Sequence, residues 1–93
     1  VQQILVNIQP VGNDTFRVHL PGGVRDFSTL AEGVRHAEDA MRALVKRMAR
    51  EAGAEQVDVR VEREDKTAPV RGNRVYLGTE MRFTATGRPS LAA

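Results

Sequence analysis

The chain contains no cysteine and no tryptophan, and aromatic residues make up only 4% of its 93 positions. Without cysteine it can form no disulfide, no thiolate metal site and no thiol nucleophile. Its two histidines lie far apart in the sequence, so zinc has no evident set of ligands. No apolar run approaches the roughly 18 residues that a membrane span requires, and no charged start leads into an apolar signal core. We therefore expect a protein without membrane contact, located in the cytoplasm.

Length and composition indicate one globular domain. Hydrophobic residues make up 41% of the chain and charged residues 28%, with a net charge of only +2. This balance is typical of a chain that folds by itself, and 93 residues are enough for a single core. We expect residues 1–93 to form one small domain. Because an alternating apolar pattern starts almost at Val1, we also expect the chain to be a fragment of a larger protein.

Two-residue periodicity in the first third of the chain predicts consecutive strands. Apolar and polar side chains alternate over residues 3–9, which places three apolar ones on one face: Ile4, Val6 and Ile8. Residues 10–14 carry Pro, Gly, Asn and Asp, which favour a turn, and the alternation resumes over residues 16–20. After a second turn at Pro21-Gly22-Gly23, residues 24–27 are predicted to form a short third strand.

A long amphipathic helix is predicted to follow. Thr29 and Glu32 have the spacing of a capping box, in which the threonine hydroxyl accepts a hydrogen bond from the amide three residues on. Gly53 follows the last helical residues, where a left-handed cap favours glycine. Apolar residues recur every three or four positions, which predicts a buried stripe: Leu30, Val34, Ala37, Met41, Leu44, Val45 and Met48.

Two more strands are predicted after the helix. Valines at positions 57, 59 and 61 alternate with charged residues, which indicates a strand with one apolar face. Residues 64–73 combine charges with Pro69 and Gly72, and we predict a loop there that reverses the chain. The alternation then returns, with Gly78 as a candidate bulge and these residues on the apolar face: Val75, Leu77, Thr79, Met81, Phe83 and Ala85.

Together these elements predict an α+β fold. We expect a four- or five-stranded, mostly antiparallel sheet with one long amphipathic helix on one face, in the order β-β-(β)-α-β-β. The helix covers the apolar face of the sheet, and the opposite face is polar and either solvated or docked against a partner. Five side chains on that polar face form a candidate interaction surface: Arg17, His19, Arg60, Tyr76 and Arg82.

Side chains suited to catalysis or metal binding do not form a recognisable motif. His19 is predicted to be an exposed strand residue, and His36 lies one helical turn after Glu32, as in an ordinary surface pair. The acidic residues of segment 62–65 lack the glycine turn of a calcium loop. The glycine pair at positions 22–23 matches no phosphate-binding motif and is assigned to a hairpin turn. We predict no catalytic, cofactor-binding or metal-binding residue.

Positive charge gathers on the last turns of the helix and indicates an alternative function. The basic patch consists of Arg42, Lys46, Arg47 and Arg50. Phosphate backbones of nucleic acids bind such patches. Cations near a helix C-terminus are, however, favoured by the helix dipole in any protein. A sheet that binds single strands also needs stacking aromatics, and Tyr76 is the one candidate on the predicted open face.

Four segments together form a pattern that can be compared with known families. Two lie in the first half of the chain: the opening strand Val1 to Gln9, and Phe27 to Glu32, which leads into a long Ala- and Arg-rich helix. Two lie in the second half: Ala52-Gly53-Ala54, which leads into Val57-Asp58-Val59-Arg60-Val61, and the closing Phe83 to Pro89. In these packing and turn patterns, which cover nearly the whole chain, it resembles the C-terminal region of hydantoinase A/oxoprolinase-like proteins. The resemblance implies a parent enzyme that uses ATP to open or carboxylate small cyclic amides or related carbonyl compounds. Its nucleotide site would lie upstream, in an actin-like portion.

The resemblance places no catalytic residue in this chain. We expect a non-catalytic accessory or assembly domain, the C-terminal piece of such an enzyme. Its polar sheet face or a sheet edge would bind another domain or subunit of the parent, or a second copy of the chain in a homo-oligomer. Binding of nucleic acid by the basic patch is the alternative function.

Overall fold

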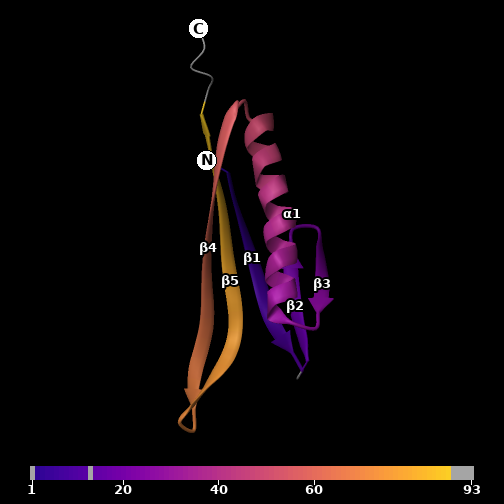
Figure 1. The fold of residues 1–93 in the computed structure, drawn as a ribbon, viewed down its shortest axis with the longest axis vertical. Coiled ribbons are helices and arrows are strands. Elements are labelled where there is room, and N and C mark those ends of the chain that lie inside the picture. Colours follow the sequence, from indigo (N-terminus) through magenta and orange to yellow (C-terminus); the bar gives the residue numbers. More distant parts are fainter. Residues whose placement is uncertain (1, 13, 89–93) are drawn as a thin grey trace.

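The computed structural model describes residues 2–12 and 14–88, so Asn13 in the first predicted turn and both chain ends lie outside the described residues. A five-stranded antiparallel sheet and one helix make up the fold (Figure 1). Their bounds are β1 Gln2–Val11, β2 Thr15–Leu20, β3 Gly23–Phe27, α1 Leu30–Glu51, β4 Gln56–Val70 and β5 Asn73–Arg88. The predicted α+β fold and element order are confirmed, including the short third strand. The strands lie in the order β3-β2-β1-β5-β4, with β1 in the middle.

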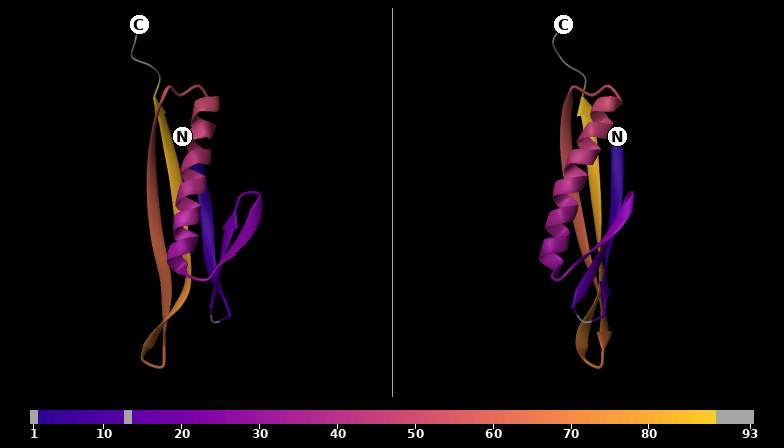
Figure 2. Two further views of the ribbon diagram at one scale, coloured as in Figure 1. Left: turned by 45° about the vertical axis from the view of Figure 1, so that its right-hand side comes forward. Right: turned by 90° about the vertical axis from the view of Figure 1, so that its right-hand side faces the viewer.

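Helix and sheet form two layers. Figure 2 shows α1 lying along one face of the sheet, with the β2–β3 hairpin to one side. No element among residues 2–12 and 14–88 covers the opposite face. We call this opposite side the bare face.

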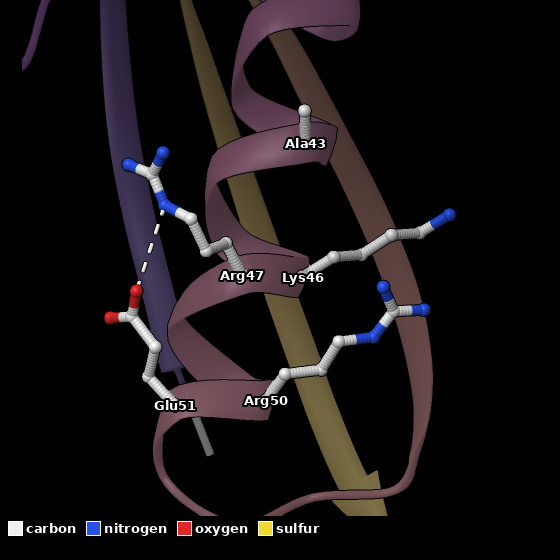
Figure 3. A pocket seen from close by; sticks show the side chains of 5 residues that line it. All are labelled: Ala43, Lys46, Arg47, Arg50 and Glu51. Atoms are coloured by element: carbon white, nitrogen blue, oxygen red, sulfur yellow. Dashed lines mark ion pairs between the residues drawn. The ribbon is translucent and has the colours of Figure 1, made fainter.

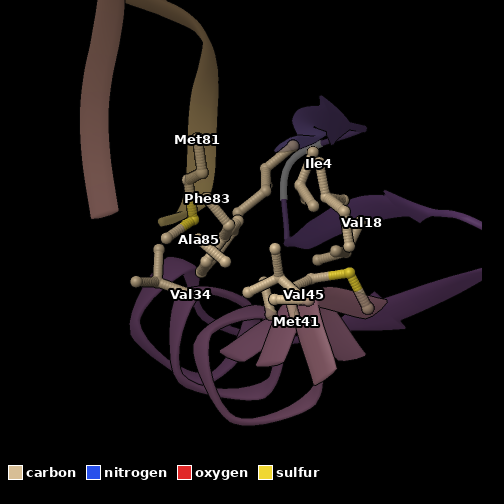
Figure 4. Packing of buried hydrophobic residues seen from close by; sticks show 12 residues of the cluster. Ile4, Val18, Val34, Met41, Val45, Met81, Phe83 and Ala85 are labelled. Atoms are coloured by element: carbon tan, nitrogen blue, oxygen red, sulfur yellow. The ribbon is translucent and has the colours of Figure 1, made fainter. Parts of the chain in front are cut away.

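The core lies between α1 and the helix side of the sheet (Figure 4). As the two-residue periodicity predicted, Ile4, Val6 and Ile8 of β1 are buried. Further buried side chains come from β2, α1 and β5: Val18, Val34, Ala37, Met41, Val45, Ala49, Met81, Phe83 and Ala85. The remaining predicted helix positions, Leu30, Leu44 and Met48, are partly buried and pack against this cluster.

Both ends of α1 carry the predicted caps. The hydroxyl of Thr29 accepts a hydrogen bond from the Glu32 amide at 3.2 Å. At the other end Gly53 has a φ of 101°, which is a left-handed conformation. The amides of Gly53 and Ala54 donate to carbonyls of the last helical turn at 3.0 and 3.1 Å. This pair of bonds is a Schellman motif, and it turns the chain toward β4.

The predicted loop over residues 64–73 is wrong. β4 continues to Val70, and only Arg71 and Gly72 form the turn, both with positive φ (51° and 82°). A two-residue turn of this kind matches the twist of the strands that it joins. Pro69 favours a loop in the sequence pattern, but β4 is an edge strand, where proline is tolerated.

The ends of β4 and β5 project beyond the helix as a two-stranded arm, residues 66–78 (Figure 1). The molecule is therefore elongated, with extents of 62 × 25 × 16 Å. All charged side chains of the arm are positive, because residues 66–78 contain no Asp or Glu. Three hydrophobic side chains of the arm are exposed: Val70, Val75 and Leu77.

A bulge at Leu77 changes which side of β5 faces the helix. Lys66 lies opposite Gly78 and Thr67 lies opposite Tyr76, so Leu77 is the extra residue on β5. An extra residue shifts the two-residue alternation of a strand. The predicted apolar positions Val75 and Leu77 are consequently exposed, which corrects the prediction. The four positions after the bulge, from Thr79 to Ala85, are buried as predicted.

The bulge depends on glycine at position 78. A Cβ there would lie 2.9 Å from the carbonyl oxygen of Ile8, in the neighbouring strand. We expect Gly78→Ala to lower the free energy of unfolding by about 1–3 kcal/mol, because the backbones of β1 and β5 must move apart. Urea unfolding measures the change. Gly23→Ala is the control, since a Cβ there meets no atom within 4 Å. Equal losses in both variants would contradict the close approach.

Candidate interaction surface

Four of the five predicted surface residues lie together on the bare face. On β1 the core residues face the helix, so Leu5 and Asn7 point the other way. His19 on β2 lies opposite Asn7, and Arg82 on β5 lies opposite Leu5. The same register places the other two candidates, Arg17 and Arg60, on this face.

Tyr76, the fifth candidate, lies on the helix side of the sheet, and its predicted place on the polar face is wrong. Its ring packs edge-on against Phe16, with 6.0 Å between ring centroids. Its hydroxyl lies 2.5 Å from the hydroxyl of Thr79, a buried residue of the helix side. The bulge at Leu77 causes this change of face, because it reverses the alternation for the residues before it.

Charged side chains pair with one another along the two flanks of the bare face. On the β2–β3 flank, Arg17 Nε donates to Asp26 at 2.9 Å, and this hydrogen bond lowers the pKa of the Asp26 carboxyl. On the β4–β5 flank, Lys66 Nζ donates to Glu80 at 3.0 Å and lowers the pKa of the Glu80 carboxyl. Two more ion pairs lie on this flank: Arg88–Asp58 and Arg60–Glu62. Because these groups are exposed, the pairs fix the local charge pattern more than they stabilise the fold.

Between the flanks, the central strand presents only uncharged side chains to the bare face. These are Gln3, Leu5, Asn7, Gln9 and Val11. Leu5 is 50% exposed, and Val24 at the β3 side of the same face is 54% exposed. A centre without charges inside a charged rim is typical of surfaces that bind another protein.

A second polar cluster lies on the helix side, where the arm leaves the core. Tyr76 donates to Thr79, which donates in turn to Asp65 Oδ1 at 2.7 Å. The guanidinium of Arg63 donates to both oxygens of Asp65, each at 3.1 Å. The hydrogen bonds from Thr79 and Arg63, in that order, lower the pKa of the Asp65 carboxyl. This network ties β4 to β5 just before the bulge.

The lowered pKa of Asp65 predicts a pH dependence of stability. The network stabilises the fold above the ordinary Asp pKa of about 3.9 and loses this effect as the pH falls through the lower folded pKa. We expect Asp65→Asn to reduce the free energy of unfolding at about pH 7 by less than about 1 kcal/mol, because the carboxylate is partly exposed. At about pH 2 the difference should vanish. Urea unfolding at both pH values measures it, and a constant difference would contradict the role of the carboxylate.

Neither histidine side chain makes a hydrogen bond within the part of the chain that the structure describes. His19 is partly exposed, and its Nε2 atom is shielded from solvent and makes no hydrogen bond within the described residues. His36 was expected to pair with Glu32, but its ring packs on Phe27, with 5.2 Å between centroids.

Acidic residues of β4 do not converge. Glu62 and Glu64 point to the bare face and Asp65 to the helix side, because they alternate along the strand. Among residues 2–12 and 14–88, no group of three or more His, Asp or Glu residues is placed to hold a metal ion.

The structure divides the predicted basic patch. Lys46, Arg47 and Arg50 line a hollow on the solvent side of α1, together with Ala43 and Glu51. Figure 3 shows Lys46 and Arg50 extending to one side of the helix and Arg47 to the other, where it forms an ion pair with Glu51 at 3.9 Å. Of the three patch residues drawn, Lys46 and Arg50 extend in the same direction. Arg42, the fourth member, is exposed one helical turn before Lys46 and does not line the hollow.

Within the part of the chain that the structure describes, no helix combines the length and the apolar character that crossing a membrane requires. Comparison of the chain with models of protein families, with curated proteins and with solved structures finds no match. The proposed function is therefore based on the geometry of the bare face.

Proposed function

We propose that the chain is a non-catalytic accessory or assembly domain of a cytoplasmic protein, and that it docks through the bare face of its sheet. The observation that carries this proposal is the neutral centre of that face around Leu5. One exposed leucine is ordinary on a protein surface. Here, however, every bare-face residue of the central strand is uncharged, while ion pairs line the flanks. A partner that covers this centre contacts Leu5 directly and meets the charged side chains of Arg82 and Glu80 beside it, which lie opposite Leu5 and Asn7.

The resemblance to hydantoinase A/oxoprolinase-like proteins supports a particular partner. In that setting the chain would be the C-terminal part of an ATP-dependent enzyme acting on cyclic amides, and the bare face would meet another domain or subunit of it. No residue of this chain would take part in the chemistry.

A site-specific cross-link in the full-length parent protein tests the docking face. A photoreactive amino acid replaces Leu5, and mass spectrometry identifies the peptides to which it becomes joined. We expect cross-links to defined peptides of another domain or subunit. Ala43, exposed on the solvent side of α1, is the matched control position. If position 5 yields no more cross-links than position 43, the bare face is not the docking surface.

Nucleic-acid binding is the second candidate function, and the parallel course of Lys46 and Arg50 favours it (Figure 3). Two neighbouring cations with the spacing of one helical turn can approach successive phosphates. The structure does not support nucleic-acid binding through base stacking on the bare face, however. Tyr76 packs against Phe16 and is not available on the bare face for base stacking.

Titration with single- and double-stranded oligonucleotides tests this alternative. If the chain binds phosphates, affinity should fall steeply between low and high salt, with a slope of about −0.9 per phosphate contacted on duplex DNA. Lys46→Glu with Arg50→Glu should abolish binding. Arg47→Glu is the control with weaker effect, since Arg47 is already paired with Glu51. Absence of salt-sensitive binding would exclude this function.

A further inference from the structure

One edge of β4 is not covered by any strand of the described residues. β4 is the last strand of the sheet order β3-β2-β1-β5-β4, and it runs for 15 residues. An uncovered edge presents unpaired amides and carbonyls to which another strand can bind. The opposite edge of the sheet, β3, has only 5 residues, and a short edge is itself a protection against pairing.

Lysine and proline, the strongest protective residues of β4, lie in only one half of the strand, whereas other charged side chains, which also discourage pairing, occur along both halves. Lysine and proline on an edge strand discourage pairing with a further strand. In β4 they are Lys66 and Pro69, both in the arm. The other half, Gln56–Glu62, contains neither, and its three valines are only partly buried on the helix side. This half is the part of the edge that is suited to pairing.

The sequence of this half is complementary to itself when reversed. With two copies antiparallel and Val59 opposite Val59, each Val57 faces a Val61 and each Asp58 faces an Arg60. Gln56 then faces Glu62, so no two like charges are opposed within the segment. Moving the centre by one residue places Asp58 opposite Asp58 in one direction and Arg60 opposite Arg60 in the other. Opposed like charges destabilise strand pairs, whereas opposite charges and branched aliphatic pairs stabilise them.

We propose that the chain forms a two-fold symmetric dimer in which Gln56–Glu62 of β4 pairs antiparallel with the same segment of a second copy. Val59 lies on the two-fold axis, and the two sheets join into one. A symmetric contact of this kind closes on itself and leaves the Gln56–Glu62 edge of neither copy open to a third. The remaining edge of β4, in the arm, is the part that contains Lys66 and Pro69. The valines of both copies meet on the helix side, and the Asp58–Arg60 pairs meet on the bare-face side. The proposal uses the edge of β4, so it stands or falls independently of docking through the bare face.

Charge reversal and its compensation test the dimer and its register. Sedimentation equilibrium of the wild-type chain, at concentrations up to about 1 mM, should give twice the monomer mass of 10.3 kDa. Asp58→Arg places arginine opposite arginine and should raise the dissociation constant by about tenfold or more. Adding Arg60→Asp restores the opposite charges and should restore the dimer. Glu64→Arg makes the same charge change outside the paired segment and should leave the dimer intact.

Circular dichroism of each variant verifies that the monomer remains folded. A wild-type chain that stays monomeric, a dimer that survives Asp58→Arg, or a folded double variant that stays monomeric would each overturn the proposal.

A single introduced cysteine gives a second test of the register. The chain has no cysteine of its own, so Val59→Cys supplies one thiol per copy, opposite its symmetry mate. Directly opposed antiparallel residues have Cα atoms about 4.5–5.5 Å apart, within the range that a disulfide spans. Mild oxidation should link Val59→Cys into a covalent dimer faster than Glu64→Cys, which lies outside the paired segment. Equal rates for the two variants would contradict the register.

Discussion

Phe83→Ala is expected to leave the protein largely unfolded or close to it. Phe83 is fully buried on β5, between Ile4 of β1 and Val61 of β4, and it is the largest fully buried side chain. Its truncation should lower the free energy of unfolding by about 3–5 kcal/mol. The free energy of unfolding of a domain of this size lies near the low end of about 5–15 kcal/mol. The expected loss is therefore a large part of the stability of the protein.

Urea unfolding followed by circular dichroism measures this effect. Thr84→Ala is the matched control, because Thr84 is the next residue of the same strand and points to the bare face. We expect a change within about 0.5 kcal/mol for it. If the two variants lose similar amounts, the helix side of β5 is not the core.

Met41→Ala has the second largest expected effect and tests the orientation of α1. Met41 is 4% exposed and packs in the middle of the core, whereas its neighbour Arg42 is exposed to solvent (Figure 4). We expect a loss of about 2–5 kcal/mol for Met41→Ala and well under about 1 kcal/mol for Arg42→Ala. Thermal or urea unfolding of both variants compares them. A larger loss for Arg42→Ala would mean that the helix presents its other side to the sheet.

Leu44 was predicted to be as deeply buried as Met41, but the structure shows it only partly buried. Its truncation should therefore cost less than that of Met41, because part of its surface is in water in the folded state. Leu44 belongs to the margin of the buried stripe. Periodicity identifies the stripe but does not distinguish its centre from its margin, which depends on the width of the sheet underneath.

The sequence predicted those elements that are determined by residues close together in the chain. The alternation around Val6 predicted β1, and the spacing of Val34, Met41 and Val45 predicted the buried side of α1. Thr29 and Gly53 predicted its two ends, because caps are made by residues next to the helix. Each of these signals is contained in a short stretch of chain.

The arm and the bulge could not be predicted in the same way. In the β4 half of the arm most side chains are exposed, so it lacks the one-sided apolar pattern that marks a strand, and Pro69 and Gly72 resemble a loop. In the β5 half the alternation from Val75 predicted a strand but assigned its faces wrongly. The hydrogen bonds of the arm come from pairing between β4 and β5. The bulge is likewise a property of the pair, because Leu77 is extra only relative to Lys66 and Thr67. Gly78 was the one local indication of it.

The candidate surface was predicted only in part, because periodicity within a strand is a local signal and the arrangement of strands is not. Arg17, His19, Arg60 and Arg82 share a face because two-residue periodicity holds along each of their strands. Tyr76 lies before the bulge, where the periodicity has shifted. The neutral centre of the face depends on β1 being the middle strand, and strand order cannot be derived from the pattern of one strand. The prediction thus found individual members of the surface but not its arrangement.

The central position of β1 beside β5 has a consequence for how the chain folds. Gln2 lies opposite Ala85 and Ile8 opposite Thr79, so the middle of the sheet joins the two most distant strands of the sequence. Closing so long a loop is entropically unfavourable until the contacts at its ends form. A topology dominated by such non-local pairing folds slowly compared with helical proteins of the same length. During synthesis on the ribosome, β1 must therefore wait for almost the entire chain to emerge before it acquires its second neighbour.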